Sequence, residues 1–172
     1  MNVIISPSIP TDLKLAKEAV FDKAHLELTN LQKEDESDQY SAYRFQFNNS
    51  KICYREAKIT PTKTGQFVTL WKRNQSGIIE PFDDSDPIDF VIVSVRKDLN
   101  WGHFIFPKNI LLEKSIFSTP NKEGIRATRV YPPWDETMSK QAQKTQKWQL
   151  DYFIMLTNSN EIDFNQLKKI FA

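Results

Sequence analysis

Residues 54–73 carry the sequence YREAKITPTKTGQFVTLWKR, which determines how the middle of the chain folds. The segment begins as an alternating strand, is interrupted by Pro61, turns at Gly65 and resumes as a second strand that ends at Trp71–Arg73. Its twenty positions contain five cations, one acid and a cluster of three threonines. Positive charge, hydroxyl groups and a flat aromatic ring suit a nucleic-acid backbone and its bases, so this stretch indicates a polyanion-binding surface.

The composition is typical of one globular domain. The chain has 172 residues, of which 40% are hydrophobic, and this is enough for a single packed core. No apolar run approaches the ~20 residues of a membrane helix, and the first residues do not resemble a secretory signal. We therefore expect a cytoplasmic protein without membrane insertion. The single cysteine, Cys53, excludes an internal disulfide and a cysteine-based zinc site.

The net charge of +1 conceals a segregated distribution. Residues 41–80 sum to +5 and residues 101–150 to +4, whereas residues 81–100 between them sum to −3. Folding would bring the two basic blocks together on one surface, or each block would simply be a solvated face. The charge pattern alone leaves both alternatives open.

The order of elements predicts an α+β or mixed α/β fold, with a central, mostly antiparallel sheet flanked by helices in a single domain 1–172. We expect an N-terminal helical region at 1–35, a core at 40–156 and a C-terminal helix within 157–172. The second half of the stretch 12–32 also fits the period of a strand. The predicted core strands are 43–47, 51–59, 66–73, 88–95, 103–106 and 126–131, and the predicted core helices are 108–113 and one capped by Ser139.

Glu56 and Lys58 form a Glu-x-Lys pair on the predicted strand 51–59, where alternation places both side chains on one face. This pair matches the second half of the PD…(D/E)xK signature of restriction-type nucleases, in which the carboxylate holds Mg²⁺ and the lysine stabilises charge on the phosphate. The more ordinary alternative is a surface ion pair.

A magnesium site would need a second acid close to Glu56. A hairpin with Asn49 and Ser50 at its tip places Glu56 opposite Tyr43, which is not acidic. The remaining candidates lie elsewhere in the chain and are Glu36, Asp38 and Asp89. The metal site is therefore incomplete as the sequence stands.

The second basic block combines Arg126 and Arg129 with the helix that follows Ser139. On that helix three lysines, at positions 140, 144 and 147, share one face beside Trp148. Such a face is suited to following a polyanion without reading its sequence. The alternative is that Trp148 and Trp134 are core aromatics and that the lysines keep the surface soluble.

Five segments of the chain resemble the MepB family, and the similarity extends from about Ser37 to Phe153. The segments are 57–63 (AKITPTK), 65–73 (GQFVTLWKR), 104–108 (FIFPK), 129–134 (RVYPPW) and 143–149 (QKTQKWQ). The resemblance implies a small cytoplasmic bacterial protein, encoded with a multidrug efflux pump, that has a nuclease-like fold and binds nucleic acid. The family pattern favours an apolar residue in place of Glu56, which leaves Lys58 as the better candidate for a phosphate contact.

These observations lead to a nucleic-acid-binding protein on a restriction-nuclease-like core, with an accessory role in drug resistance or stress. DNA and RNA, and the oligomeric state, remain open, and no cofactor is required. The predicted binding residues are Lys58, Thr60, Thr62, Lys63, Trp71, Lys72, Arg73, Arg126, Arg129, Lys144 and Trp148. One alternative is a Mg²⁺-dependent nuclease with Glu56 and Lys58 as catalytic residues and Glu56, Asp38 and Asp89 as metal ligands. Another is a protein- or drug-binding accessory factor of an efflux system.

Overall fold

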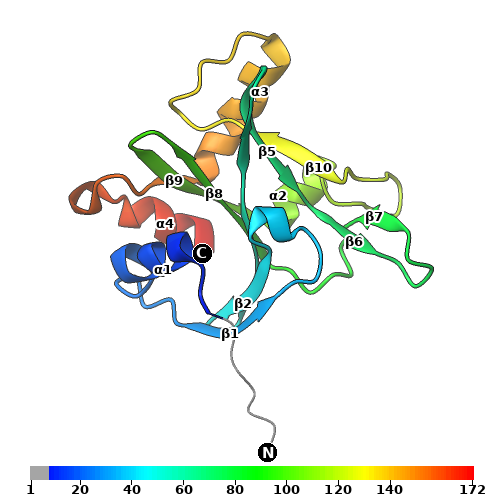
Figure 1. Cartoon of the computed structure of the whole chain (residues 1–172), viewed down its shortest axis with the longest axis horizontal. Coiled ribbons are helices and arrows are strands. Elements are labelled where there is room, and N and C mark those ends of the chain that lie inside the picture. The colour runs from blue at the N-terminus through cyan, green and yellow to red at the C-terminus, as the bar shows by residue number, and fades with distance from the viewer. Residues whose placement is uncertain (1–7) are drawn as a thin grey trace, which may run out of the picture.

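A six-stranded sheet forms the centre of the computed structural model, which describes residues 8–172 (Figure 1). Its strand order is β1-β2-β3-β8-β9-β11, and every neighbouring pair is antiparallel except β3 and β8, which are parallel. The predicted α+β fold with a mostly antiparallel sheet is thereby confirmed. The six strands are β1 (Leu28–Lys33), β2 (Tyr43–Phe47), β3 (Ser50–Glu56), β8 (Phe90–Lys97), β9 (Asn100–Pro107) and β11 (Phe153–Met155).

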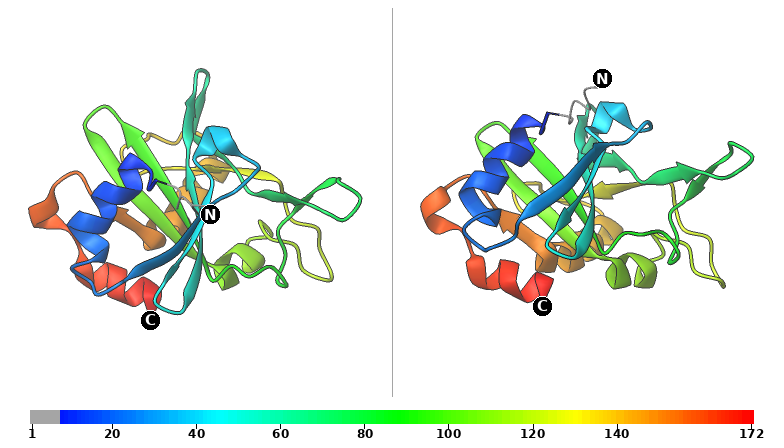
Figure 2. Two further views of the ribbon diagram at one scale, coloured as in Figure 1. Left: turned by 60° about the horizontal axis from the view of Figure 1, so that its bottom comes forward. Right: turned by 90° about the horizontal axis from the view of Figure 1, so that it is seen from below.

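Two smaller sheets are attached to this centre. The first has the order β10-β5-β4 and the second is a two-stranded ribbon of β6 and β7 that projects away from the main sheet (Figure 2). Their strands are β4 (Lys58–Thr60), β5 (Lys63–Thr69), β6 (Trp71–Arg73), β7 (Ile79–Pro81) and β10 (Ala127–Val130).

Helices cover both faces of the main sheet. The α-helices are α1 (Thr11–Ala16), which continues as a π-helical turn Lys17–Phe21, α2 (Lys108–Glu113), α3 (Lys140–Gln149) and α4 (Phe164–Phe171); short 3₁₀ turns occur at Asp38–Tyr40, Leu150–Tyr152 and Ser159–Glu161. Side chains of α1 and α4 pack into one apolar cluster with the sheet, and those of α2, β5 and β10 pack into a second cluster.

The alternation of β8 explains how one sheet supports two clusters. Val91, Val93 and Val95 point into the cluster with α2 and β5, whereas Ile92 points into the cluster with α1 and α4. A continuous β-branched run is what a strand buried on both faces requires, so the prediction made from 88–95 is confirmed.

The β2–β3 hairpin turns one residue earlier than its sequence suggested. Asn48 adopts a left-handed φ of 53°, so the two-residue turn is Asn48-Asn49 and Phe47 pairs with Ser50. The register shifts accordingly, and Tyr54 rather than Glu56 lies opposite Tyr43. The predicted pairing of Glu56 with Tyr43 was therefore wrong.

The N-terminal region is less helical than expected for 1–35. Helical structure ends at Phe21, and Leu28–Lys33 forms the edge strand β1 paired with β2, which is the period-two alternative. The part of that expectation at residues 1–7 lies outside the described residues. The C-terminal helix of 157–172 is confirmed as α4, capped by Asp163, whose side chain accepts the N–H of Gln166.

Candidate nucleic-acid interface

The two basic blocks of the sequence meet where β10 pairs with β5. Arg129 lies opposite Phe67 in this antiparallel pair, so a residue of the second block is placed beside the Pro61–Gly65 hairpin. Its Nη2 donates to Thr60 Oγ1 at 2.7 Å, and its Nη1 lies 3.4 Å from the carbonyl oxygen of Gly65. A guanidinium of the second block is thereby fixed against the hairpin of the first.

A groove of about 390 Å³ lies between this small sheet and α3, and we call it the β5–α3 groove. Its polar lining includes Lys63, Thr128, Arg129, Gln141 and Thr145. Within residues 8–172, neither Lys63 nor Arg129 forms an ion pair with a carboxylate. Neither positive charge is therefore neutralised by a carboxylate, although the Arg129 guanidinium also donates to Thr60 and to the hairpin backbone.

Buried Gln149 fixes the position of α3 against β10. Its Oε1 accepts the N–H of Tyr131 at 2.8 Å, and its Nε2 donates to the carbonyl oxygen of Arg129 at 2.9 Å. This role was missed in the sequence, where Gln149 follows Ala142 and Thr145 on one helical face and thus carried a signal of burial. The side chain thereby ties the end of α3 to the backbone of β10 and of the residue that follows it.

Gly65 allows the hairpin to approach the loop that follows β10. Its φ is +82°, and a Cβ at this position would lie 2.7 Å from the ring of Tyr131. Only glycine fits both the backbone conformation and this close approach.

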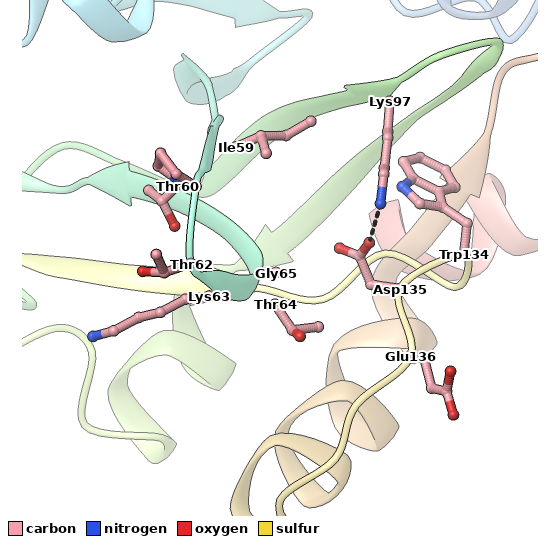
Figure 3. Close-up of a pocket in the computed structure, with 11 residues that line it drawn as sticks. Ile59, Thr60, Thr62, Lys63, Thr64, Gly65, Lys97, Trp134, Asp135 and Glu136 are labelled. Atoms are coloured by element: carbon pink, nitrogen blue, oxygen red, sulfur yellow. Dashed lines mark ion pairs between the residues drawn. The ribbon is translucent and has the colours of Figure 1, made fainter.

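A second cavity, of about 500 Å³, lies on the other side of the same hairpin, and we call it the hairpin pocket (Figure 3). Asp135 enters it with a side chain that is only 8% exposed, and its Oδ1 lies 3.8 Å from Lys97 Nζ. Burial raises the pKa of the Asp135 carboxyl, although Lys97 and the backbone of Gly65 oppose this shift. Beside them Nε1 of Trp134 is buried, and no group of residues 8–172 accepts a hydrogen bond from it.

Three of the predicted phosphate contacts are occupied by acids. Lys72 Nζ lies 2.8 Å from Asp86 and 3.1 Å from Asp83, and it lies 3.7 Å from Glu80, which is paired with Lys72 across the β6–β7 ribbon. Burial lowers the pKa of Lys72, but its hydrogen bonds to Asp86 and Asp83 outweigh burial and the pKa is raised. Lys72 is therefore committed to the acidic segment of the protein itself.

The other two of these cations are also paired. Arg73 binds Glu36, and Arg126 Nη2 lies 3.0 Å from Glu123. The structure thus divides the predicted basic surface, because the β6–β7 side is neutralised internally while the groove side keeps its charge.

The two tryptophans predicted to stack on bases are both partly covered by other residues of the protein. Trp148 is half-buried, and its ring centroid lies 5.5 Å from that of Phe106 in the core. Trp71 is half-buried and is covered on one face by the guanidinium of Arg73, 5.4 Å from its ring centroid. For Trp148, packing in the core, the alternative considered above, describes the structure better.

The remaining predicted contacts lie around the hairpin and on α3. Lys58 is exposed, with Nζ 5.3 Å from the ring centroid of Tyr40, and Thr62 is exposed at the hairpin tip. Lys144 is exposed on α3, whereas the hydroxyl oxygen of Thr60 already accepts from Arg129.

The Glu56–Lys58 pair is divided between two sheets. Glu56 is the last residue of β3 and accepts a hydrogen bond from the Tyr54 hydroxyl at 2.8 Å, whereas Lys58 begins β4 in the smaller sheet. The chain leaves the main sheet at Ala57, so the expected single strand 51–59 was wrong and the two side chains do not share a strand face.

The acids proposed as metal ligands are likewise separated. Asp38 pairs with Lys33 at 2.7 Å, and Asp89 Oδ2 accepts the backbone N–H of Lys51 at 2.7 Å. In the described part of the chain, no three His, Cys, Asp or Glu side chains gather closely enough to hold a metal ion. The structure therefore does not bring Glu56, Asp38 and Asp89 together. Among the helices of residues 8–172, none has the length and apolar character needed to cross a membrane.

Comparison with known proteins gives one close and one distant similarity. The family model described as MepB-like matches residues 34–155. A crystal structure of MepB is 32% identical, covers 87% of this chain and 99% of its own, and superposes with a TM-score of 0.76. A bacterial homing endonuclease covers 83% of this chain and 93% of its own at 13% identity, and its TM-score of 0.41 is too low to support an inference. No curated protein matches the chain.

Proposed function

The chain belongs to the MepB-like family, and on that premise we propose that it binds nucleic acid through phosphate contacts along the β5–α3 groove. The proposal is carried by the β5–β10 pairing, which brings Lys63 and Arg129 to one groove where neither has a carboxylate partner among residues 8–172. Unpaired cations in a concave site lined by hydroxyl groups match the charge and the acceptor oxygens of a phosphate backbone.

The shape of this surface favours contacts to the backbone. Thr128, Thr145 and Gln141 add neutral hydrogen-bonding groups to the groove, and Lys144 and Lys58 are exposed beyond it. Few cations are involved, so we expect moderate affinity and a shallow salt dependence, with a slope of roughly one unit per phosphate neutralised.

Replacement of the two cations of the β5–α3 groove by neutral residues should weaken nucleic-acid binding and leave the rest of the surface unchanged. For Lys63→Ala combined with Arg129→Gln, we expect about tenfold weaker binding of an oligonucleotide, with a salt slope reduced by about 1–2. Fluorescence anisotropy with a labelled oligonucleotide over a series of salt concentrations measures both quantities.

Arg126→Ala is the matched control. Arg126 immediately precedes β10, the strand that contains Arg129, but it is already paired with Glu123. Its affinity should stay within about twofold of the unchanged protein. Equal weakening by the control and the double variant would contradict the proposed groove, as would a double variant that binds like the unchanged protein. Thermal unfolding of each variant tests whether the loss of the Arg129–Thr60 bond alters folding.

The Mg²⁺-dependent nuclease has less support than binding, because Glu56 and Lys58 lie in different sheets. The accessory role in drug efflux stays a prediction from the family resemblance.

A further inference from the structure

We propose that the hairpin pocket receives an unpaired guanine base from the strand whose phosphates lie along the β5–α3 groove. This inference rests on the proposed function, since the base would be delivered by the same bound strand. It adds a base-recognition site to a surface that otherwise contacts only phosphates.

The position of Lys63 connects the two cavities. Its residue lines both the groove and the pocket, and its ammonium group extends away from Asp135 (Figure 3). A strand that crosses the hairpin tip would therefore place a phosphate at Lys63 outside and the attached base inside. Ile59, Pro61 and Trp134 give the pocket apolar surface for the faces of a planar base.

The polar groups of the pocket are arranged as a donor beside a strong acceptor. The Asp135 carboxylate, whose side chain is 8% exposed, offers two acceptor oxygens at the wall of an open pocket, and the Lys97 ammonium lies 3.8 Å from its Oδ1. In the same place the indole N–H of Trp134 has no acceptor among the residues that the structure describes. Lys97 and the backbone of Gly65 both act on this carboxylate, and a ligand that supplies two donors would use its remaining acceptor capacity.

Guanine complements this arrangement better than the other bases. Its Watson–Crick edge presents two neighbouring donors, N1–H and the N2 amino group, which match the two oxygens of a carboxylate, and O6 beside them accepts from an ammonium or indole N–H. Adenine and cytosine present one amino group on this edge, and thymine presents only N3–H. Because the same edge is occupied in a base pair, the pocket selects an unpaired base.

The test compares labelled oligothymidylates of about twelve nucleotides that carry one central dG, dA or dC. We expect about tenfold tighter binding of the dG strand than of the other two. Asp135→Asn, which keeps the side-chain size, should remove this preference. Glu136→Gln is the matched control, because Glu136 is the neighbouring acid on the same loop but is exposed, and this variant should keep the preference.

The outcomes separate the inference from the function on which it rests. Equal binding of the three strands by the unchanged protein, or a preference for dG that survives in Asp135→Asn, would overturn the guanine site and leave phosphate binding intact. Failure of every strand to bind would overturn both. Lys63→Ala should weaken all three strands equally and so report on the phosphates alone.

Discussion

Replacement of Glu34 by alanine is expected to lower the free energy of unfolding by about 3–5 kcal/mol, because it leaves a buried guanidinium without its counter-charge. Arg55 is 1% exposed, and its Nη1 lies 2.5 Å from Glu34 Oε2. The same guanidinium donates to the backbone carbonyls of Tyr54 and Thr69, so it joins the main sheet to β5. Glu34 also binds Arg44 of β2.

The matched control for this prediction is Glu36→Ala, which removes an acid two residues away. Glu36 pairs with Arg73, but both side chains are more than 40% exposed, so the expected loss is below about 1 kcal/mol. Urea unfolding of both variants, with the midpoint of thermal unfolding as a second readout, measures the difference. A loss at Glu34 no larger than the loss at Glu36 would show that water compensates Arg55.

Local signals in the sequence predicted most of the elements correctly. Pro107 immediately precedes α2 as its N-cap residue, and Ser139 caps α3 by accepting the N–H of Ala142 at 3.0 Å. These features depend on a few adjacent residues, whose backbone preferences and hydrogen bonds are readable without knowledge of the fold.

Long-range pairing limited the prediction of the site. Nothing adjacent to Lys72 indicates that Asp83 and Asp86 fold back onto it, since these partners approach only after the β6–β7 ribbon and its following loop have formed. The change of sheet at Ala57, between β3 and β4, could not be predicted from the sequence for a related reason. A period of two describes β3 and β4 equally well, and it does not reveal that the chain changes sheets between them.

The structure brings two predicted binding residues, Lys63 and Arg129, to one groove because strand pairing joins the two basic segments that contain them. Arg129 and Lys63 are far apart in the chain, yet the pairing of β10 with β5 brings their segments side by side. The two basic segments could be recognised in the sequence, but their contact could not, because it depends on long-range interactions of buried groups such as Gln149.

Acid is expected to destabilise the protein through His103, which lies on β9 and is fully buried. Neither ring nitrogen has a hydrogen-bond partner in the described part of the chain. Its pKa is lowered to about 3, chiefly by burial, with Asp12 of α1 opposing the shift and Arg96 adding to it. Tyr54 of β3 also faces the imidazole, with ring centroids 6.1 Å apart. The folded state therefore favours the neutral ring, and the unfolded state takes up the proton as pH falls below about 6.5.

Because the pKa of His103 is lower in the folded state than in the unfolded state, the protein loses stability as the pH falls from about 6.5 to about 3. His103 alone should remove about 2–3 kcal/mol between about pH 7 and about pH 4.5. In His103→Leu, which keeps an apolar group in the site, the loss measured by urea unfolding should be smaller by this amount. His25→Asn is the control, since His25 is exposed with φ of 60°, a conformation that asparagine tolerates, and it should follow the unchanged protein. Stability curves for His103→Leu and the unchanged protein that run parallel over this range of pH would show that the buried imidazole does not govern acid unfolding.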